Sequence, residues 1–296
     1  MGKAAAKEVV RRGGKVLIGS RSEEKLAAAA AEIAADCSLD PEEAAARIAV
    51  QSVDASDEAS VRAFFAAVPA GAYNGLVVSA AARSVHGSFL DLDVARVREF
   101  VDSKFWGAYH CAKYGAPVLA DGGGIVLFSG GVMTTMGTLR DMTSRALPAL
   151  TLSLMTTTPR AEDGGVRRLP LRVGILSRRP GVNCSPLAVC NGAVEGLVRS
   201  LALELGPRLR VNCFSPGFVD TERFDHMDPE RKAAMLASTA SSLPLQRVGA
   251  PEDAGLALHF LMQSGYTTGA VLDLDGGHQV RQYATQVNDP MRKSAV

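Results

Sequence analysis

Residues 208–222 read RLRVNCFSPGFVDTE, a short apolar run that ends in a Pro-Gly turn. The run over residues 209–214 predicts a buried strand, and the turn follows at Pro216 and Gly217. Ligands of open α/β sheets bind beyond the carboxyl ends of the strands, so this turn is a candidate part of a binding site. Taken alone, a Pro-Gly pair is equally consistent with a plain turn that binds nothing.

Helical and strand patterns alternate on both sides of this strand. The expected elements are helix 3–12, strand 15–19, helix 22–35, strand 47–52, helix 57–67, strand 75–80, helix 92–116, strand 124–129, helix 184–205, an irregular helical stretch after residue 217, helix 251–263 and strand 270–274. This alternation predicts an α/β fold in which helices cover both faces of a parallel sheet. We expect one domain over residues 1–277, interrupted by a stretch without clear periodicity at about 131–174 and followed by a polar tail, 278–296.

The charge balance argues against a polyanionic partner. Lys plus Arg number 32 and Asp plus Glu number 31, a formal net charge of +1. We therefore expect a small-molecule substrate and neither nucleic acid nor a membrane surface. The apolar runs are too short to span a bilayer, and the first residues lack a secretory signal, so the expected location is the cytoplasm. Neither the five cysteines nor the five histidines show metal-ligand spacing, which predicts no metal site and buried free thiols in a reducing compartment.

Four segments in order resemble the short-chain dehydrogenase/reductase family. They are Arg210-Val211-Asn212, Ser215-Pro216-Gly217 with Thr221, RVGAPED at 247–253, and Asp275-Gly276-Gly277. The family has a Rossmann-type, doubly wound parallel sheet and moves hydride between a nicotinamide and a carbonyl or alcohol. The resemblance covers about residues 2–130 and 175–277. It implies that Pro216, Gly217, Val219 and Thr221 contact the nicotinamide half of the cofactor.

The resemblance also assigns the adenosine half of the cofactor. The strand at 15–19 leads into Ser20 and Arg21, where a carboxylate would bind the free 2′-hydroxyl of NAD and a guanidinium suits a 2′-phosphate. NADP is therefore expected in preference to NAD. Asp54 matches the family residue that meets the adenine amino group. The alternatives are a solvated Arg21 near a helix start and Asp54 as a helix cap.

Two further segments match family positions that lie along the bound cofactor. Ser79 and Ala80 stand where the family carries its Asn-Asn-Ala-Gly segment. The small size of the residues is retained there, but the two Asn side chains that brace the central sheet in the family are absent. Gly2 matches the last glycine of the family's phosphate-binding loop, T-G-x-x-x-G-x-G. We therefore expect the first strand to be missing, and losing about five buried apolar side chains should cost about 8–15 kcal/mol. Because a domain is stable by only about 5–15 kcal/mol, a start codon assigned too late is the favoured explanation.

The stretch 131–174 falls where the family joins its fifth strand to its catalytic helix. An intron read in frame is the favoured interpretation, because Ser129-Gly130 would otherwise continue directly into Ile175. A lid over the substrate is the alternative, although the stretch lacks the aromatic anchors expected of one.

The catalytic set departs most from the family, which uses a Ser, a Y-x-x-x-K pair and an Asn. Here Gly130 falls at the Ser, with Ser129 just before it, and Leu187 falls at the Tyr. Asn191 falls at the Lys and Lys104 at the Asn, so the two residue types are exchanged. Our hypothesis is that Lys104 extends its ammonium into the space vacated at Asn191 and keeps a ribose and phosphate contact. A solvated Lys104 on the helix surface is the alternative.

A second Y-x-x-x-K match, Tyr109 to Lys113, lies on the preceding helix. The i,i+4 spacing places both side chains on one helix face. The match comes one strand too early in the chain, so a core or dimer contact is the favoured interpretation.

Three functions remain open. The first is a slow NADP-dependent oxidoreductase acting on a small carbonyl or alcohol, since a missing general acid typically costs about 10²–10⁴ in rate. The second is a dinucleotide-binding or interaction protein that has lost catalysis, and the third is a defective gene product without a stable fold. The resemblance further implies a homodimer or homotetramer that pairs through the segments Val97 to Gly115 and Val189 to Leu205.

Overall fold

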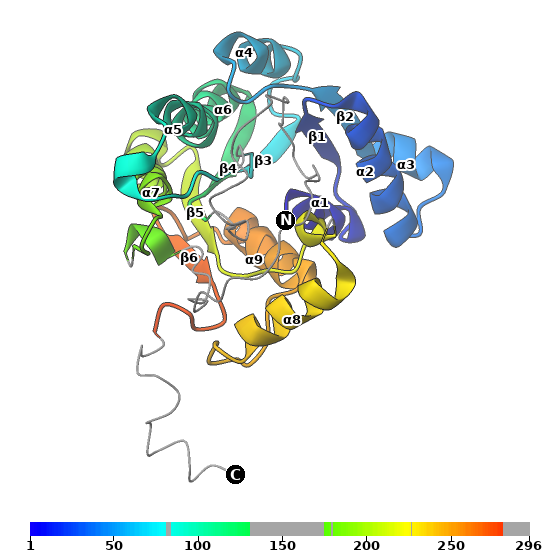
Figure 1. The fold of residues 1–296 in the computed structure, drawn as a ribbon. Helices are drawn as coiled ribbons and strands as arrows, with labels where there is room; N and C mark the ends of the chain where they lie inside the picture. Colours follow the sequence, from blue (N-terminus) through cyan, green and yellow to red (C-terminus); the bar gives the residue numbers. More distant parts are fainter. Residues whose placement is uncertain (81–83, 131–174, 179, 226, 281–296) are drawn as a thin grey trace.

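The computed structural model describes residues 1–80, 84–130, 175–178, 180–225 and 227–280 (Figure 1). The strands are β1 (Val16–Ser20), β2 (Ile48–Ser52), β3 (Tyr73–Val78), β4 (Leu119–Phe128), β5 (Arg210–Pro216) and β6 (Val271–Leu274). All paired strands run parallel, and helices cover both faces, which confirms the expected α/β class. The stretch 131–174 and residues 281–296 of the tail, for which we expected an insert and a polar extension, lie outside the described residues.

The helices follow the sequence-based expectations closely, with three differences, of which the interruption of the helix expected over 92–116 is described below. They are α1 (Gly2–Arg11), α2 (Glu23–Asp36), α3 (Pro41–Arg47), α4 (Glu58–Ala66), α5 (Val94–Val101), α6 (Gly107–Gly115), α7 (Ser185–Leu205), α8 (Pro229–Ala240) and α9 (Pro251–Gln263). Helix α3 was not expected, although Asp40 caps it and Pro41 opens it. The irregular stretch after residue 217 contains the regular helix α8, which Asp228 caps.

The strands form two sheets, with the orders β1-β2 and β3-β4-β5-β6. In the described part of the chain, β1 and β3 therefore each pair on one side only. The four-stranded sheet is the better buried of the two: β4 and β5 are almost entirely inaccessible over residues 123–128 and 211–216, whereas most residues of β1 and β2 are half-buried or exposed. The core of the molecule thus lies on the β4-β5 side.

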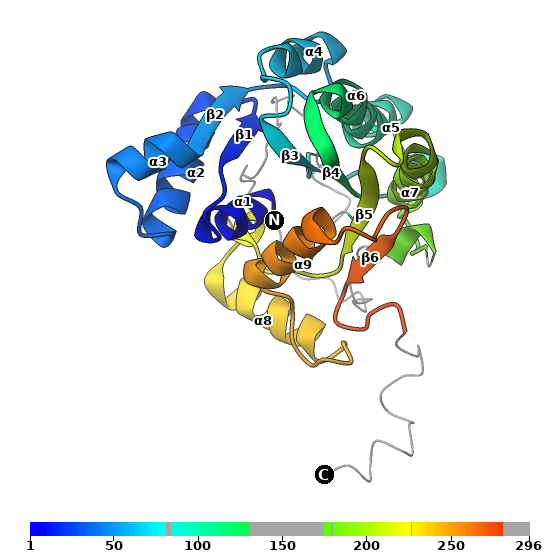
Figure 2. The same ribbon diagram turned by 180° about the vertical axis from the view of Figure 1, so that it is seen from behind.

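Two apolar clusters sandwich strand β4. Ile125 and Leu127 pack toward Val194 of α7, whereas Val126 and Phe128 pack toward Leu258 of α9. The alternation of neighbouring residues between two buried faces is expected for a strand covered on both sides. Figure 2 shows α1 and α9 side by side on one side of the strands, and α1 also packs against α2.

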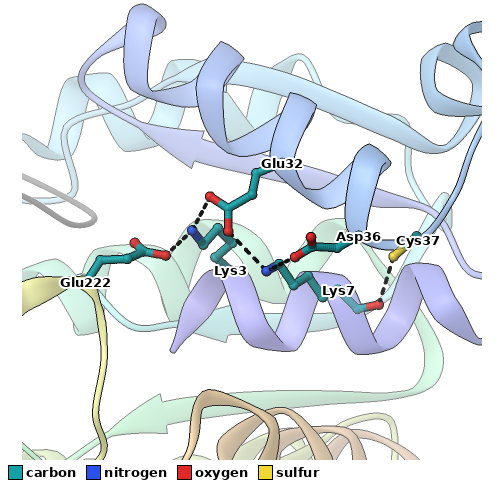
Figure 3. A network of polar contacts seen from close by, with 6 residues as sticks. All are labelled: Lys3, Lys7, Glu32, Asp36, Cys37 and Glu222. Carbon is teal, nitrogen blue, oxygen red and sulfur yellow. Dashed lines mark hydrogen bonds and ion pairs between the residues drawn. The ribbon is translucent and has the colours of Figure 1, made fainter. Parts of the chain in front are cut away.

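Helix α1 is joined to its neighbours by a network of ion pairs (Figure 3). Lys3 pairs with Glu32 of α2 and with Glu222, and Lys7 pairs with Glu32 at 3.1 Å and with Asp36. The hydrogen bond from Lys7 holds the pKa of the Asp36 carboxyl below its ordinary value. The network thus joins α1 to α2 and to the segment at Glu222.

The helix expected over 92–116 is interrupted by one π-helical stretch, Asp102–Trp106, between α5 and α6. Single π-turns inside helices occur often at functional sites, because the wider turn redirects side chains. Ser103 and Lys104 lie in this turn and are both buried, with 3% exposure each.

No helix in the described ranges combines the length and the apolar character needed to cross a membrane.

Candidate functional site

Buried polar side chains gather where β4 and β5 end. Ser129 follows β4, Ser215 lies near the end of β5, and Asn191 projects from α7; all three are fully inaccessible to solvent. Neither hydroxyl has a hydrogen-bond partner among the described residues, and the same holds for both polar atoms of the Asn191 amide. Because buried polar groups are nearly always satisfied in folded proteins, these atoms indicate a place for a ligand or ordered water.

Lys104 reaches the same place from the π-turn. Its ammonium donates a hydrogen bond to the carbonyl oxygen of Gly130, directly after Ser129. Its charge also acts on the thiol of Cys190, the neighbour of Asn191 on α7. The structure therefore brings Lys104, Ser129 and Asn191 to one end of the sheet. The alternative of a solvated Lys104 is wrong, because the π-turn points this residue into the protein.

The two positions that carry the family's Ser and Tyr hold no proton donor. Leu187 is fully buried on α7 among apolar neighbours that include Phe100. Gly130 packs so closely on β5 that a Cβ there would lie 2.6 Å from Cγ of Pro216. A serine at position 130 therefore needs a shift of the chain, whereas the neighbouring Ser129 is accommodated in the core.

The sequence analysis missed a buried carboxylate on α7. Glu195 is 5% exposed and accepts a hydrogen bond of 2.6 Å from Oγ of Ser177. Leu187, Asn191 and Glu195 follow one another at intervals of four, so all three lie on one buried face of the helix. The sequence signal that could have revealed Glu195 was this four-residue spacing of an amide and an acid on an otherwise apolar helix face.

Burial also sets the state of the nearby thiols. Desolvation raises the pKa of Cys190 to about 11, although the Lys104 ammonium opposes the shift, and it raises the pKa of Cys213 on β5 to about 11. Both thiols are protonated at neutral pH and make poor nucleophiles. All five cysteines are free; Cys37 and Cys111 are partly accessible, which corrects the expectation that every thiol is buried.

The turn after β5 is held tightly against β6. The amide of Gly217 donates to the carbonyl of Leu274 at 2.7 Å, and a Cβ at Gly217 would lie 2.7 Å from Cβ of Asp275. Val219 is buried and pairs with Gly249 in an isolated bridge, whereas Thr221 is half-buried at the start of a short 3₁₀ helix. The turn therefore places backbone atoms that no side chain covers at Gly217, at the carboxyl edge of the sheet beside Ser215.

The adenosine-side residues also meet at a strand end. Ser20, the last residue of β1, is 4% exposed, and its hydroxyl has no partner in the described residues. Arg21 is half-buried, and its guanidinium lies 3.5 Å from Asp54. Burial lowers the pKa of Arg21, and the Asp54 carboxylate opposes that change. A freely solvated Arg21 is therefore ruled out.

Asp54 is not a helix cap. It accepts hydrogen bonds from the amide and hydroxyl of Ser56, while Asp57 caps α4 through the amide of Ala59. The capping alternative for Asp54 is therefore wrong, and the carboxylate instead orders the loop between β2 and α4 and faces Arg21.

A cavity of about 420 Å³ runs between the two sheets, and its lining includes the three cofactor-side positions not yet described, Gly2, Ser79 and Ala80, as well as Ser20 and Arg21. Gly2 is the first residue of α1, and backbone amides at a helix start attract phosphate groups. Together with the unpartnered hydroxyls and the close turn at Gly217, these residues fit a dinucleotide laid across the carboxyl edge.

The second Y-x-x-x-K match lies away from this edge. Lys113 pairs with Glu58 of α4 at 3.1 Å, and Tyr109 is exposed and packs edge-on against Trp106. The pair therefore contributes to the surface of α6 and is not part of the site. In the described part of the molecule, no group of three or more His, Cys, Asp or Glu residues is placed to hold a metal ion.

A family model described as enoyl-(acyl carrier protein) reductase matches residues 1–146 and 174–279 of the chain. Among curated proteins, the chain is 34% identical over 121 residues to 3-oxoacyl-(acyl-carrier-protein) reductase FabG of Chlamydia muridarum, covering 40% of this chain and 46% of that protein. It is 30% identical over 171 residues to dehydrogenase/reductase SDR family member 4 of Homo sapiens, covering 55% and 59%. The chain thus spans about half the length of the curated relatives that it matches.

Solved structures show the same fold. A small-chain dehydrogenase in complex with NADPH matches with a TM-score of 0.62 at 28% identity, covering 90% of this chain and all of that one. An NADPH-bound short chain oxidoreductase from Pseudomonas aeruginosa PAO1 matches with a TM-score of 0.69 at 24% identity, covering 96% of this chain and 93% of that one. These likenesses confirm the Rossmann-type architecture.

Proposed function

The chain belongs to the short-chain dehydrogenase/reductase family, and on that premise we propose that it binds NADP(H) and serves hydride transfer to a small carbonyl compound, or the reverse. The bound nicotinamide would supply the hydride. The observation that carries the proposal is the set of buried, unpartnered polar atoms at the carboxyl edge, together with the charge of Lys104. Binding and orienting the cofactor is the protein's main task in such chemistry.

Each half of the cofactor has its own residues in this proposal. Ser20 and Arg21 hold the adenosine ribose, and the guanidinium favours a 2′-phosphate over a free hydroxyl. Asp54 meets the adenine. Replacing Arg21 with Ala should therefore lower the affinity for NADPH by about tenfold and leave that for NADH nearly unchanged.

The first turn of α1 at Gly2, together with Ser79 and Ala80, accepts the diphosphate region. At the other end, the turn of Pro216, Gly217, Val219 and Thr221 receives the nicotinamide. These assignments are supported by the position of both segments at strand ends that border the same edge.

Three residues act at the reacting end. Lys104 provides a fixed positive charge beside Gly130 and contacts the nicotinamide ribose, and Asn191 has both amide atoms available to complete that contact. The hydroxyl of Ser129 offers a hydrogen bond to the substrate oxygen. Because Leu187 and Gly130 cannot donate a proton, this proposal replaces the missing Tyr with water, or with a substrate whose product anion is already stable, and it predicts slow turnover.

The test is a titration of the purified chain with NADPH, followed by the rise of cofactor fluorescence. Lys104→Ala should weaken binding about tenfold, and Lys104→Met, which keeps the buried stem, should do the same. Lys113→Ala is the matched control, because Lys113 lies on the neighbouring helix, away from the site, and pairs with exposed Glu58. Unchanged affinity in both Lys104 variants would show that this residue does not touch the cofactor.

A non-catalytic dinucleotide-binding protein is the second candidate, favoured by the apolar side chain at Leu187. NADPH oxidation with a panel of ketones and enones separates the two. Turnover above the no-enzyme rate, lost in Lys104→Ala, supports the oxidoreductase. Tight binding without any turnover supports the binding protein.

Exposed apolar side chains on the π-turn, α6 and α7 support the expected pairing of copies. Trp106 and Tyr109 are partly exposed, and Val189 is 68% exposed, so apolar side chains face solvent on these neighbouring segments. We propose that they form a homodimer contact. Sedimentation of Trp106→Ala should then show a larger monomer fraction than the parent chain.

A further inference from the structure

The connection between β3 and α5 carries a histidine, His86, to the start of α7. Val85 packs in one apolar cluster with Leu187, and the amide of Gly87 donates a hydrogen bond of 3.2 Å to the carbonyl of Asn183. Both segments lie where strands of the parallel sheet end and helices begin. His86 is therefore held at the carboxyl edge, where ligands of open α/β sheets bind.

The ring of His86 is oriented by a thiol. Its Nδ1 atom lies 3.8 Å from Sγ of Cys184, which is 2% exposed and directly precedes α7. This thiol donates its single proton to the carbonyl oxygen of Val182 at 3.3 Å. Sγ therefore accepts from the ring, so Nδ1 carries a proton and Nε2 is the nitrogen that gains and loses one.

His86 contacts α7 close to the position at which the family carries its Tyr. Cys184 and Leu187 are three residues apart, so they lie on one face of the helix and about 4.5 Å apart along its axis. Leu187 has no proton to donate. The imidazole thus stands about one helical turn from the place of the missing donor, and histidine is the side chain that most often serves as an acid or base in catalysis.

The other ionisable side chains described along this part of α7 are less suited to the task. Burial raises the pKa of the Cys190 thiol to about 11, and Lys104 is held by a backbone carbonyl. Glu195 is hydrogen-bonded to a serine and lies about 12 Å further along the helix axis than Leu187. His86 is half-buried, so solvent can return a proton to its ring.

We propose that His86 is the proton donor when this chain reduces a carbonyl compound. The inference rests on the proposed function, and it gives to a residue of the chain the proton that would otherwise come from water. The carbonyl carbon accepts a hydride from NADPH, which is oxidised to NADP. The electron pair of the C=O π bond moves to the oxygen, which takes the proton from Nε2 of the imidazolium and becomes the alcohol. The neutral ring then regains a proton from solvent.

The experiment measures NADPH affinity and turnover of the full chain, with acetophenone, cyclohexanone and cyclohexenone as the probes. His86→Gln should lower kcat by about 100-fold or more, to the rate that water alone supports, and leave the affinity for NADPH unchanged. His110→Gln is the matched control, because this ring stacks on Trp106 of the π-turn and should not affect turnover. A His86→Gln variant that keeps the parent kcat would overturn the inference and leave the proposed function standing.

Chemical rescue separates proton donation from a packing role. Added imidazole should raise the rate of His86→Ala by about tenfold or more, because it supplies the missing acid. Pyrazole has the same ring shape but stays unprotonated near neutral pH, so it should not raise the rate. Equal rates with the two additives would show that the ring only fills space at this position and would overturn the proposal.

A measurement without cofactor tests the orientation of the ring. In nitrogen-15 NMR spectra of the parent chain, with the signals assigned by their loss in His86→Gln, neutral His86 should carry its proton on Nδ1. Cys184→Ala removes the acceptor, so the variant should lose this preference and several-fold in kcat, with the affinity for NADPH unchanged. A neutral ring protonated on Nε2 in the parent chain would overturn the proposal.

Failure of the proposed function has a different signature. The parent chain itself then binds no NADPH, or binds it and reduces none of the probes, and the inference about His86 falls with it.

Discussion

The two halves of the sheet differ in how they exclude water. In β4 and β5, Ile125, Leu127, Val211 and Phe214 are wholly inaccessible, and helices cover both of their faces. In β1, four of five residues are only half-buried, and the strand lines the cavity between the two sheets. The contrast teaches that a parallel strand becomes a core strand only when neighbours pair with it on both edges. Helix α1 and its ion pairs hold the β1-β2 half in place without filling it.

The largest expected effect compares one leucine in each half. Leu127→Ala removes a fully buried side chain from β4 and should lower the free energy of unfolding by about 2–5 kcal/mol. Leu17→Ala, on β1 beside the cavity, should cost less than half as much, because the surroundings of Leu17 already leave space. Urea denaturation of both variants checks this expectation. Equal losses of unfolding free energy would contradict the contrast between the two halves of the sheet.

The next effect probes the close packing at the end of β4. Gly130→Ser places a Cβ against the ring of Pro216 and should destabilise the protein by about 1–3 kcal/mol without increasing turnover. Gly192→Ala on α7 is the control, since nothing lies within 4 Å of a Cβ there and the change should be neutral or stabilising. A stable, faster Gly130→Ser enzyme would show that the chain moves easily at this point.

The pH dependence of stability tests the burial of the β4-β5 half in a second way. Cys190 and Cys213 have pKa values raised to about 11 by burial, above the value near 9 that a thiol has in the unfolded chain. Above about pH 9 the unfolded thiols lose protons while the folded ones keep them, so stability falls as pH rises. Each thiol should cost about 1 kcal/mol by pH 10.

The measurement is the thermal midpoint between pH 8 and pH 10 for the parent chain and for Cys213→Ala. The thermal midpoint of Cys213→Ala should fall less steeply with rising pH than that of the parent chain. Parallel declines would mean that this thiol is not shielded from water as its position in β5 implies.

The smallest effect concerns the ion pairs of α1. Lys7→Met should lower stability by about 0.5 kcal/mol at low salt, because partly exposed pairs are screened and worth little. The same change should raise the pKa of Asp36 toward its ordinary value, which NMR titration can follow. In the parent chain this carboxylate's contribution is present above its ordinary pKa and is lost as pH falls through the lowered value. A difference that persists in 1 M salt would show a packing role for Lys7 instead.

Periodicity and caps determined most of the elements. The helices at 185–205 and 251–263 and all six strands lie within a few residues of their expected bounds, because each carries a local pattern that one face or both must bury. The short helix α3 was missed although Asp40 and Pro41 mark its start, since seven residues are too few to show a period.

The sequence by itself determined the α/β class, the strand-end positions of Ser20, Ser129 and the Pro216-Gly217 turn, and the loss of a proton donor at Leu187. These follow from local patterns and from residue chemistry. Only the tertiary structure decided that Lys104 is buried against Gly130, that Glu195 is hydrogen-bonded to Ser177, and that β1 and β3 line a common cavity. Each of these depends on which distant segments meet in space, and a one-dimensional pattern of burial does not contain that information.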